Sequence, residues 1–281
     1  MTRHPSERAG CQHHRVLPRL IATDLDGTLL DPSGVITPRT AAALRQAAEA
    51  GITVVFATGR PPIVAGREIE AAGHGVHYGV MANGTIVCSL PDGEVLRSHT
   101  FAASTARDAV LRLRAHDPRF GVALATDRGF TAENGFHQRM PIAPHADDAV
   151  ADALVGHEHA TDTIKLFAFH PDHGAHELMA MLPPVLGDHL VVNHMGADAV
   201  EIAPAGADKG AGLRWLCEHL DVDTADVLVF GDEVNDLPMF AVAGRRVAVA
   251  NAHPAVRAAA DEVTASNAAD GVALVIERLL A

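Results

Sequence analysis

Three short apolar runs, each followed at once by a glycine-containing turn with polar side chains, constrain the fold of this 281-residue chain most strongly. The runs are residues 20–23, 52–57 and 227–230, and they are continuous rather than alternating in hydrophobicity. A continuous apolar run is typical of a strand that is buried on both faces of a parallel sheet. Ligands of open α/β sheets bind beyond the carboxyl ends of the strands. We therefore expect the three turns to converge on one site.

Helix signals lie between these strands. Thr37 and Pro38 form a helix start, with threonine as the N-cap and proline at the first helical position, and Gly51 ends that helix. Further helices are expected over residues 210–220 and 271–280. Strands that alternate with helices indicate an α/β fold with a Rossmann-like parallel-sheet core.

The middle of the chain differs in composition from its flanks. Residues 86–204 hold 11 of the 18 histidines, and short strand-like runs there alternate with two helix-like stretches and several turn signals. We interpret this segment as an α+β cap domain that is inserted into the sheet domain. The predicted catalytic core then consists of residues 20–85 and 205–281.

Composition excludes several classes of partner. The chain has 35 Asp and Glu against 22 Lys and Arg, a formal net charge of -13, which disfavours nucleic acid and anionic membrane surfaces. One Trp and one Tyr offer no platform for stacking bases. Three scattered cysteines and the absence of an apolar run near the ~20 residues of a membrane span favour a cytoplasmic location. Residues 1–19 are expected to be a disordered tail, and no obligate protein partner is inferred.

The turn after the first strand carries two carboxylates two residues apart, Asp24 and Asp26, followed by Gly27. Like charges this close resist double ionisation unless a cation lies between them or one of them holds a proton. Because Mg²⁺ prefers oxygen ligands, we assign the first carboxylate to a magnesium site and the second to proton transfer. Gly27 lets the backbone turn sharply beside the ligand. A surface turn at a strand end is the alternative interpretation of this motif alone.

A second polar cluster, Asp232, Asn235 and Asp236, follows the third strand. Asp232 and Asp236 are four residues apart, so they share a face if the segment is helical. Their oxygens could complete a hard-metal site that begins with Asp24. Ordinary capping of a helix N-terminus is the alternative.

Several cations and donors complete the set of candidate residues. Lys209 begins a predicted helix, where a positive charge opposes the helix dipole, so we expect an anionic ligand or carboxylate partners rather than a solvated side chain. Thr58, Gly59 and Arg60 follow the second strand and offer a hydroxyl, a backbone N–H and a guanidinium suited to phosphate oxygens. Lys165, on a predicted cap strand, is a candidate contact to the leaving group of a substrate.

Taken in this order, the motifs resemble those of the haloacid dehalogenase (HAD) superfamily. Within it, the chain resembles the Cof-type phosphatases, which carry a large cap domain between the second and third motifs. The resemblance runs from Leu20 to the C-terminus. It includes Asn83-Gly84 at the entry to the cap and the segment 201–204 (EIAP) at its exit.

The resemblance implies roles for the candidate residues. Asp24 would be the nucleophile that becomes an aspartyl-phosphate, and Asp26 would be the general acid and then the general base. Mg²⁺ would be held by the Asp24 carboxylate, the main-chain carbonyl of Asp26 and Asp232, with Asp236 as a ligand or an anchor. The phosphoryl oxygens would be bound by three side chains, those of Thr58, Lys209 and Asn235.

The expected function is hydrolysis of a small phosphorylated metabolite, with sugar phosphates as the favoured class. Mg²⁺ and Lys209 would reduce the repulsion between the attacking carboxylate and the phosphate. A phosphotransferase or phosphomutase of the same superfamily is one alternative. Another is a non-catalytic sugar-phosphate-binding protein, which would be expected to lack Asp24 or Asp26. A dehalogenase would have little use for Asp26.

Overall fold

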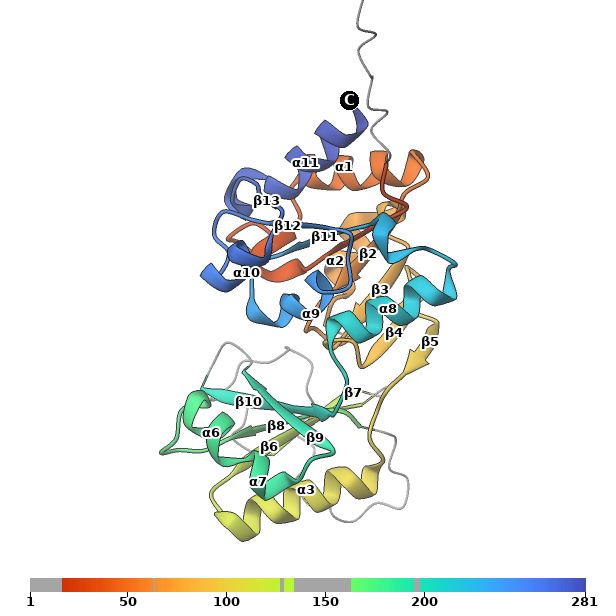
Figure 1. Ribbon diagram of the computed structural model, residues 1–281. Helices are drawn as coiled ribbons and strands as arrows, with labels where there is room; N and C mark the ends of the chain where they lie inside the picture. Colours follow the sequence, from red (N-terminus) through yellow and green to blue (C-terminus); the bar gives the residue numbers. More distant parts are fainter. Residues whose placement is uncertain (1–16, 63, 127–128, 134–162, 195–197) are drawn as a thin grey trace, which may run out of the picture.

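The computed structural model describes residues 17–62, 64–126, 129–133, 163–194 and 198–281. Within these ranges the chain forms an eight-stranded sheet and a five-stranded sheet. The two sheets lie in two lobes, with the larger sheet in the upper lobe of Figure 1 and the smaller one in the lower lobe. The chain passes from the first lobe to the second and back, so the smaller lobe is an insertion.

The larger sheet is mainly parallel, as the sequence predicts. Its strands, in spatial order, are β13 (Glu262–Val263), β12 (Arg245–Ala248), β11 (Val227–Gly231), β1 (Leu20–Thr23), β2 (Thr53–Ala57), β3 (Tyr78–Met81), β4 (Ile86–Ser89) and β5 (Val95–Ser98). Neighbours from β13 to β3 are parallel, whereas β4 and β5 are antiparallel additions at one edge. The three strands expected from continuous apolar runs are the adjacent strands β11, β1 and β2. Their side chains are almost entirely buried, which confirms the interpretation of those runs.

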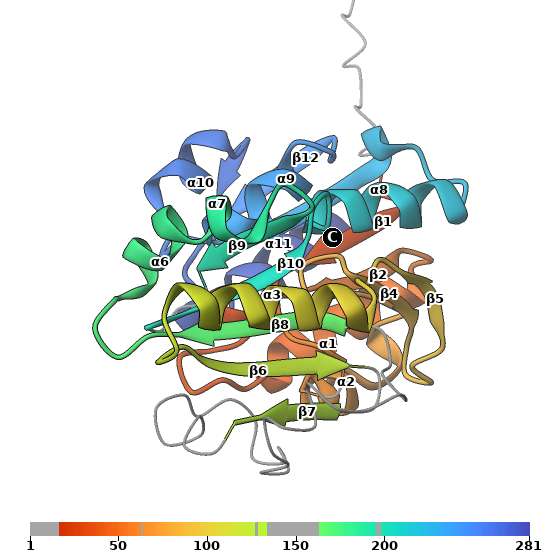
Figure 2. The same cartoon turned by 90° about the horizontal axis from the view of Figure 1, so that it is seen from below.

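Helices cover both faces of this sheet (Figure 2). The helices of this lobe are α1 (Pro38–Glu49), α2 (Gly66–Ala72), α8 (Lys209–His219), α9 (Leu237–Phe240), α10 (Pro254–Ala259) and α11 (Gly271–Leu280). Thr37 caps α1 by accepting the N–H of Thr40 at 3.1 Å, and Pro38 is its first residue, as predicted. Short helical turns link the other elements, namely η1 (Leu25–Leu29), η2 (Gly73–Gly75), η3 (Thr224–Asp226), η4 (Val234–Asp236) and η5 (Asn267–Ala269). None of the helices in the described part of the chain is both long and apolar enough to span a membrane.

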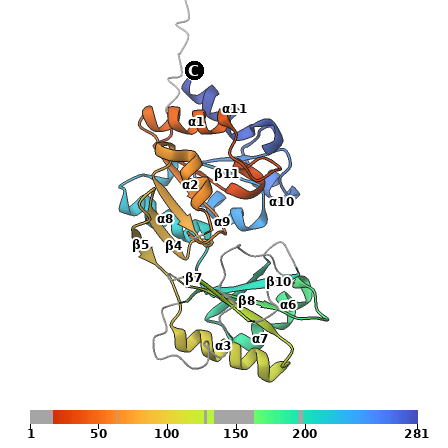
Figure 3. The same cartoon turned by 180° about the vertical axis from the view of Figure 1, so that it is seen from behind.

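The inserted lobe is an antiparallel sheet with helices on one face. Its strands, in spatial order, are β7 (Gly129–Ala132), β6 (Gly121–Thr126), β8 (Thr163–Phe169), β10 (Ala199–Pro204) and β9 (Leu190–His194). Its helices are α3 (Ala103–His116), α6 (Ala175–Met181) and α7 (Pro183–Leu186). The helices lie on the side away from the larger lobe, so the sheet faces the ends of the parallel strands (Figures 1 and 3). The inserted lobe therefore covers the predicted site.

The strand pairing bears on the predicted boundary between core and cap. The sequence assigns residues 86–204 to the cap, but β4 and β5 pair with β3 and extend the core sheet. On this pairing the insertion begins after Ser98 and ends with β10. The two edge strands are short and antiparallel, like the strands of the cap, so composition does not separate them. Of the predicted tail, residues 1–16 lie outside the described ranges.

Two glycines test the packing of these helices. Gly210 lies in α8 where this helix meets α9, and a Cβ there would be 2.3 Å from the Pro238 carbonyl oxygen. We expect Gly210→Ala to lower the free energy of unfolding by about 1–3 kcal/mol, because the added methyl group has no space. Gly66 is the first residue of α2, and a Cβ added there would have no atom within 4 Å. Gly66→Ala should therefore raise the free energy of unfolding by about 0.5–1 kcal/mol.

Urea unfolding of both variants measures these differences. A midpoint of Gly210→Ala at or above that of the unsubstituted protein would contradict the close contact between α8 and α9.

Candidate active site

The predicted site residues lie at the carboxyl ends of the three central strands. Asp24 directly follows β1, Thr58 follows β2, and Asp232 follows β11. Because β11, β1 and β2 are adjacent and parallel, these ends meet at one edge of the sheet. The cap sheet lies beyond this edge (Figure 1).

A buried ammonium group holds two carboxylates together at this edge. Nζ of Lys209 lies 2.6 Å from Oδ1 of Asp24 and 2.6 Å from Oδ1 of Asp236. The exposed fractions of Asp24, Lys209 and Asp236 are 5%, 1% and 0%. Although burial opposes the charge of Lys209, the carboxylates of Asp236 and Asp24 raise the pKa of Lys209 above its ordinary value. Lys209 thus has the carboxylate partners that its place at a helix start predicts.

Asp232 approaches this cluster from the end of β11. The hydroxyl of Thr28 donates to Oδ1 of Asp232 at 2.8 Å. Burial raises the pKa of Asp232 to about 6, opposed by the Thr28 hydrogen bond and assisted by the charge of Asp236. Gly27 makes this approach possible, since its φ is +80° and a Cβ there would lie 2.2 Å from Oδ2 of Asp232. The glycine of the first motif is therefore required by both conformation and space.

Asp236 serves mainly to organise the loop after β11. Its Oδ2 accepts the backbone N–H groups of Asp232 at 2.8 Å and Glu233 at 3.0 Å, while Oδ1 accepts from Lys209. Three donors therefore occupy this carboxylate. By contrast, Asp24 and Asp232 each accept one side-chain hydrogen bond on Oδ1. This difference favours Asp236 as the anchor and the other two aspartates as direct ligands of a cation.

The three aspartates could hold a divalent cation. One carboxylate oxygen from each of Asp24, Asp232 and Asp236 lies within 4.8 Å of the others. Burial raises the pKa of Asp24 well above its ordinary value; Lys209 opposes this shift, and the charges of Asp236 and Asp232 add to it. A buried set of oxygen donors that repel one another is the chemistry that a hard cation such as Mg²⁺ relieves, so the residues fit this ion.

Asp26 and Arg60 form a separate pair at the mouth of the site. Asp26 is exposed, and Arg60 contacts both of its carboxylate oxygens, with distances of 2.8 and 2.5 Å. The same guanidinium donates to Oε1 of Glu68 at 2.8 Å. The carboxylates of Asp26 and Glu68 raise the pKa of Arg60, and the hydrogen bonds that Arg60 donates to Asp26 contribute most. In the structure Arg60, which the sequence predicts to bind phosphate, contacts the predicted general acid.

The remaining predicted residues lie around the cluster. Thr58 is fully buried, and its hydroxyl accepts the N–H of Arg60 at 3.1 Å. Asn235 is exposed, and its Nδ2 donates to Oδ1 of Asn83 at 3.2 Å. Asn83 comes from the turn after β3 and has a positive φ of 56°. The sequence indicates a turn at Asn83-Gly84, at the entry to the cap, but a turn by itself does not predict that Asn83 contacts the site.

Sequence reasoning also missed two side chains that support the first loop. Thr28 directly follows Gly27 in the sequence, yet its contact with Asp232 depends on a partner 204 residues away. Nδ2 of Asn251 donates to the carbonyl oxygen of Gly27 at 2.7 Å. Asn251 follows β12, whose carboxyl end lies at the same sheet edge. Both contacts hold the turn that carries Asp26.

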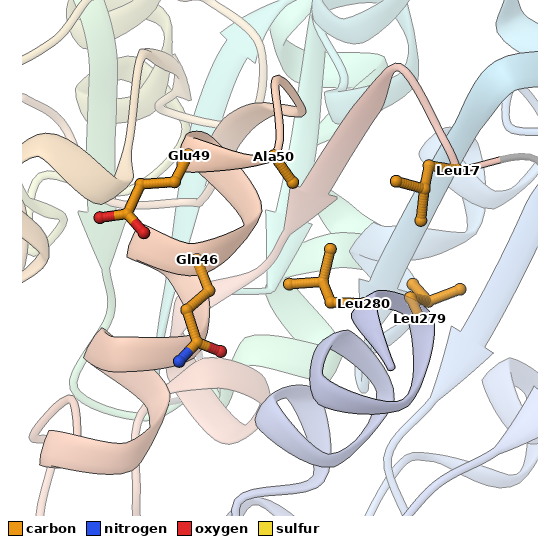
Figure 4. A pocket seen from close by; sticks show the side chains of 6 residues that line it. All are labelled: Leu17, Gln46, Glu49, Ala50, Leu279 and Leu280. Atoms are coloured by element: carbon orange, nitrogen blue, oxygen red, sulfur yellow. The ribbon is translucent and has the colours of Figure 1, made fainter.

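A hollow elsewhere on the core is unrelated to this chemistry. Its volume is about 610 Å³, and Figure 4 shows the side chains that line it. They come from the C-terminal ends of α1 and α11 and from the segment before β1, and both helices lie at the end of the core away from the cap (Figure 1). The hollow is lined by Leu17, Gln46, Glu49, Ala50, Leu279 and Leu280. With Glu49 as its one charged side chain, this hollow does not suit a phosphate.

Comparison with known proteins identifies the class of this site. The family model of haloacid dehalogenase-like hydrolases matches residues 21–276, and the chain therefore belongs to this family. An HMP-PP phosphatase from Cronobacter sakazakii is 30% identical over 249 residues, covering 85% of this chain and 86% of its own. An HMP-PP phosphatase from Serratia proteamaculans is 30% identical over 252 residues, with the same two coverages.

Solved structures agree with this assignment. A haloacid dehalogenase-like hydrolase from Bacteroides thetaiotaomicron has a TM-score of 0.80 at 26% identity, and the match covers 93% of this chain and 99% of that one. A sugar phosphatase of HAD subclass IIB has a TM-score of 0.75 at 19% identity over 92% of this chain and 98% of that one, which shows the shared fold alone. The chain is thus a phosphatase of the Cof-type branch of the family, and the resemblance seen in its motifs is confirmed.

We expect the Lys209 ammonium group to stabilise the folded protein as well as to neutralise charge in the site. Lys209→Met leaves Asp24 and Asp236 buried without their cation, so we expect the free energy of unfolding to fall by about 3–5 kcal/mol. The matched control is Arg119→Met, which removes an exposed ion pair with Asp117 on the cap. It should change stability far less, because exposed pairs are well solvated. Urea unfolding without added metal measures both, and equal losses would contradict this account.

Proposed function

We propose that this protein is a Mg²⁺-dependent phosphatase that hydrolyses small phosphorylated metabolites through an aspartyl-phosphate on Asp24, with sugar phosphates as the favoured substrate class. The observation that carries the proposal is the buried cluster of Asp24, Lys209, Asp236 and Asp232 at the ends of adjacent strands. The phosphatase names of its relatives support a small phosphorylated substrate. A cytoplasmic location, expected from composition, fits such an enzyme.

Asp24 is the nucleophile in this proposal. Its carboxylate oxygen attacks phosphorus, a bond from Asp24 to phosphorus forms, and the bond to the leaving alcohol breaks. The contact with Lys209 supports the role, because an ammonium group 2.6 Å away offsets the negative charge that would otherwise repel the phosphate. Mg²⁺, held by Asp24, Asp232 and the main-chain carbonyl of Asp26, would supply further charge neutralisation.

Asp26 handles the proton in both halves of the reaction. It donates a proton to the leaving oxygen and then takes one from the water that hydrolyses the aspartyl-phosphate. Its exposed position supports exchange of protons with substrate and solvent. The guanidinium of Arg60 holds both carboxylate oxygens, so Asp26 must break part of this contact to protonate a leaving group. Arg60 is therefore a partner of the acid rather than of the phosphate.

Three donors are proposed to bind the oxygens of the transferring phosphoryl group. They are the Thr58 hydroxyl, the Lys209 ammonium group and the Asn235 amide, assisted by the backbone N–H of Gly59. They lie after β2, at the start of α8 and after β11, so each comes from a different element. Phosphoryl transfer requires positioning and charge neutralisation above all, and donors on separate rigid elements provide both.

Asp24→Asn tests the nucleophile. The substitution keeps the side-chain shape but removes the attacking carboxylate, so release of inorganic phosphate from p-nitrophenyl phosphate should fall by at least about 10³-fold. Asp223→Asn is the matched control, because Asp223 caps the turn η3 before β11, at the opposite edge of the sheet. It should retain its activity. Substantial activity in Asp24→Asn would overturn the proposed mechanism.

Metal dependence is tested separately. Treatment with EDTA should abolish phosphate release, and added Mg²⁺ should restore it. Because Asp232 would supply a direct ligand, Asp232→Asn should raise the Mg²⁺ concentration needed for half-maximal activity by about 10–100-fold. Asp223→Asn, which removes a carboxylate at the opposite edge of the sheet, is the control and should leave that concentration unchanged. Activity that survives EDTA would contradict a role for the metal.

The same assay separates hydrolysis from transfer. With a panel of sugar phosphates and HMP-PP, kcat/KM identifies the preferred substrate. If an added alcohol captures the phosphoryl group in place of water, the protein is a phosphotransferase.

A further inference from the structure

A buried ion pair in the cap lies against the catalytic core. Lys165 on β8 and Glu201 on β10 are only 1% and 4% exposed. Nζ of Lys165 contacts Oε2 of Glu201 and donates to the carbonyl oxygen of Gly59 at 3.0 Å. Gly59 belongs to the core loop that also carries Thr58. Since desolvation makes a buried ion pair a poor source of stability, its position suggests another role.

A chain of hydrogen bonds runs from this pair to the proposed phosphate site. Nδ2 of Asn83 donates to Oε1 of Glu201 at 2.5 Å, and Nδ2 of Asn235 donates to Oδ1 of Asn83 at 3.2 Å. A carboxylate can only accept, so Glu201 turns the NH₂ group of Asn83 toward the cap and its carbonyl oxygen toward Asn235. Asn235 must then present its NH₂ group, whose second hydrogen can bind a phosphoryl oxygen.

The turn that carries Asn83 also contacts two other loops of the site. The backbone N–H of Asn83 donates to the carbonyl oxygen of Thr58 at 2.9 Å. At Gly84, where φ is +83°, a Cβ would lie 2.0 Å from the carbonyl oxygen of Asp208, just before Lys209. The turn is therefore packed between the loop of Thr58 and the start of α8. This packing fixes the backbone of the turn on both sides, so the Asn83 side-chain amide is the part of the turn that Glu201 orients.

We propose that Lys165 and Glu201 are positioning residues of the phosphate site, acting through Asn83 on Asn235. Glu201 orients the Asn83 amide, and Lys165 compensates the buried charge of Glu201 while fixing the Gly59 carbonyl. The cap thus contributes to catalysis from outside the core although neither residue touches the phosphoryl group. This role replaces a contact between Lys165 and the leaving group, and it rests on the proposed function.

A double-mutant cycle tests the series of hydrogen bonds from Glu201 through Asn83 to Asn235. Glu201→Gln keeps the size of the side chain but replaces a carboxylate, which can only accept hydrogen bonds, with an amide, which can also donate them. The orientation of the Asn83 amide is then no longer fixed, so kcat/KM for p-nitrophenyl phosphate should fall about 10–100-fold. The inhibition constant of inorganic phosphate should rise by about 10-fold, because binding of the phosphoryl oxygens is weakened. In an Asn235→Ala background the same substitution should change kcat/KM less than about twofold, because the group it orients is gone. Equal losses in both backgrounds would overturn the proposal.

A second set of variants separates positioning from stability. The double variant Lys165→Met/Glu201→Gln removes both buried charges together, so its unfolding temperature should recover relative to Lys165→Met while kcat/KM stays low. Recovery of kcat/KM along with stability would show that the pair is only structural and would overturn the proposal. If Glu201→Gln does not fold, Asn83→Gly takes its place in the cycle, since glycine tolerates the positive φ.

Two comparisons make the result specific. Arg119→Met, which removes an exposed ion pair on the cap, should leave kcat/KM unchanged. A loss equal to that of Glu201→Gln would show a general effect of the cap and would overturn the proposal. Activity in Asp24→Asn would instead overturn the proposed function itself, so the two failures are distinguishable.

Discussion

The site depends on one interaction, the buried contact of the Lys209 ammonium group with the carboxylates of Asp24 and Asp236. Burial disfavours each charge alone, and together the charges stabilise one another. The strand ends provide the acids, and the first residue of α8 provides the cation. Thr28, Gly27 and the N–H groups after β11 then set the distances within the cluster. The acids of this acidic protein gather where a cation offsets them, which fits the proposed binding of an anionic phosphate.

The two lobes contribute unequally to this site. The core presents the proposed nucleophile Asp24 and the other acids after adjacent strands and Lys209 at the start of α8, while the cap sheet faces them with its helix-free side. The buried pair of Lys165 and Glu201 connects the lobes through Gly59 and Asn83. Such contacts explain how an inserted domain can influence groups that belong to the core motifs. Polar side chains that are buried where the two lobes meet need hydrogen-bond partners, and this requirement restricts the position of the cap relative to the core.

Sequence reasoning was least complete where partners are distant along the chain. Arg60 carries a guanidinium suited to phosphate, but its partners are Asp26 and Glu68, and only the folded chain brings them together. Asn83 lay in an evident turn, yet its hydrogen bonds to Glu201 and Asn235 span more than a hundred residues. The sequence pattern does not separate the edge strands β4 and β5 from the cap, because short antiparallel strands look alike in either lobe.

The sequence by itself determined the α/β fold and the family to which the chain belongs. Continuous apolar runs, a threonine–proline helix start and closely spaced acids are local signals, and the physics that produces them acts within a few residues. Tertiary structure alone decided that Lys209 joins Asp24 to Asp236, that Arg60 holds Asp26 and that the cap reaches Asn235 through Asn83. Charges and amides choose partners by proximity in space, and local sequence patterns do not specify that proximity.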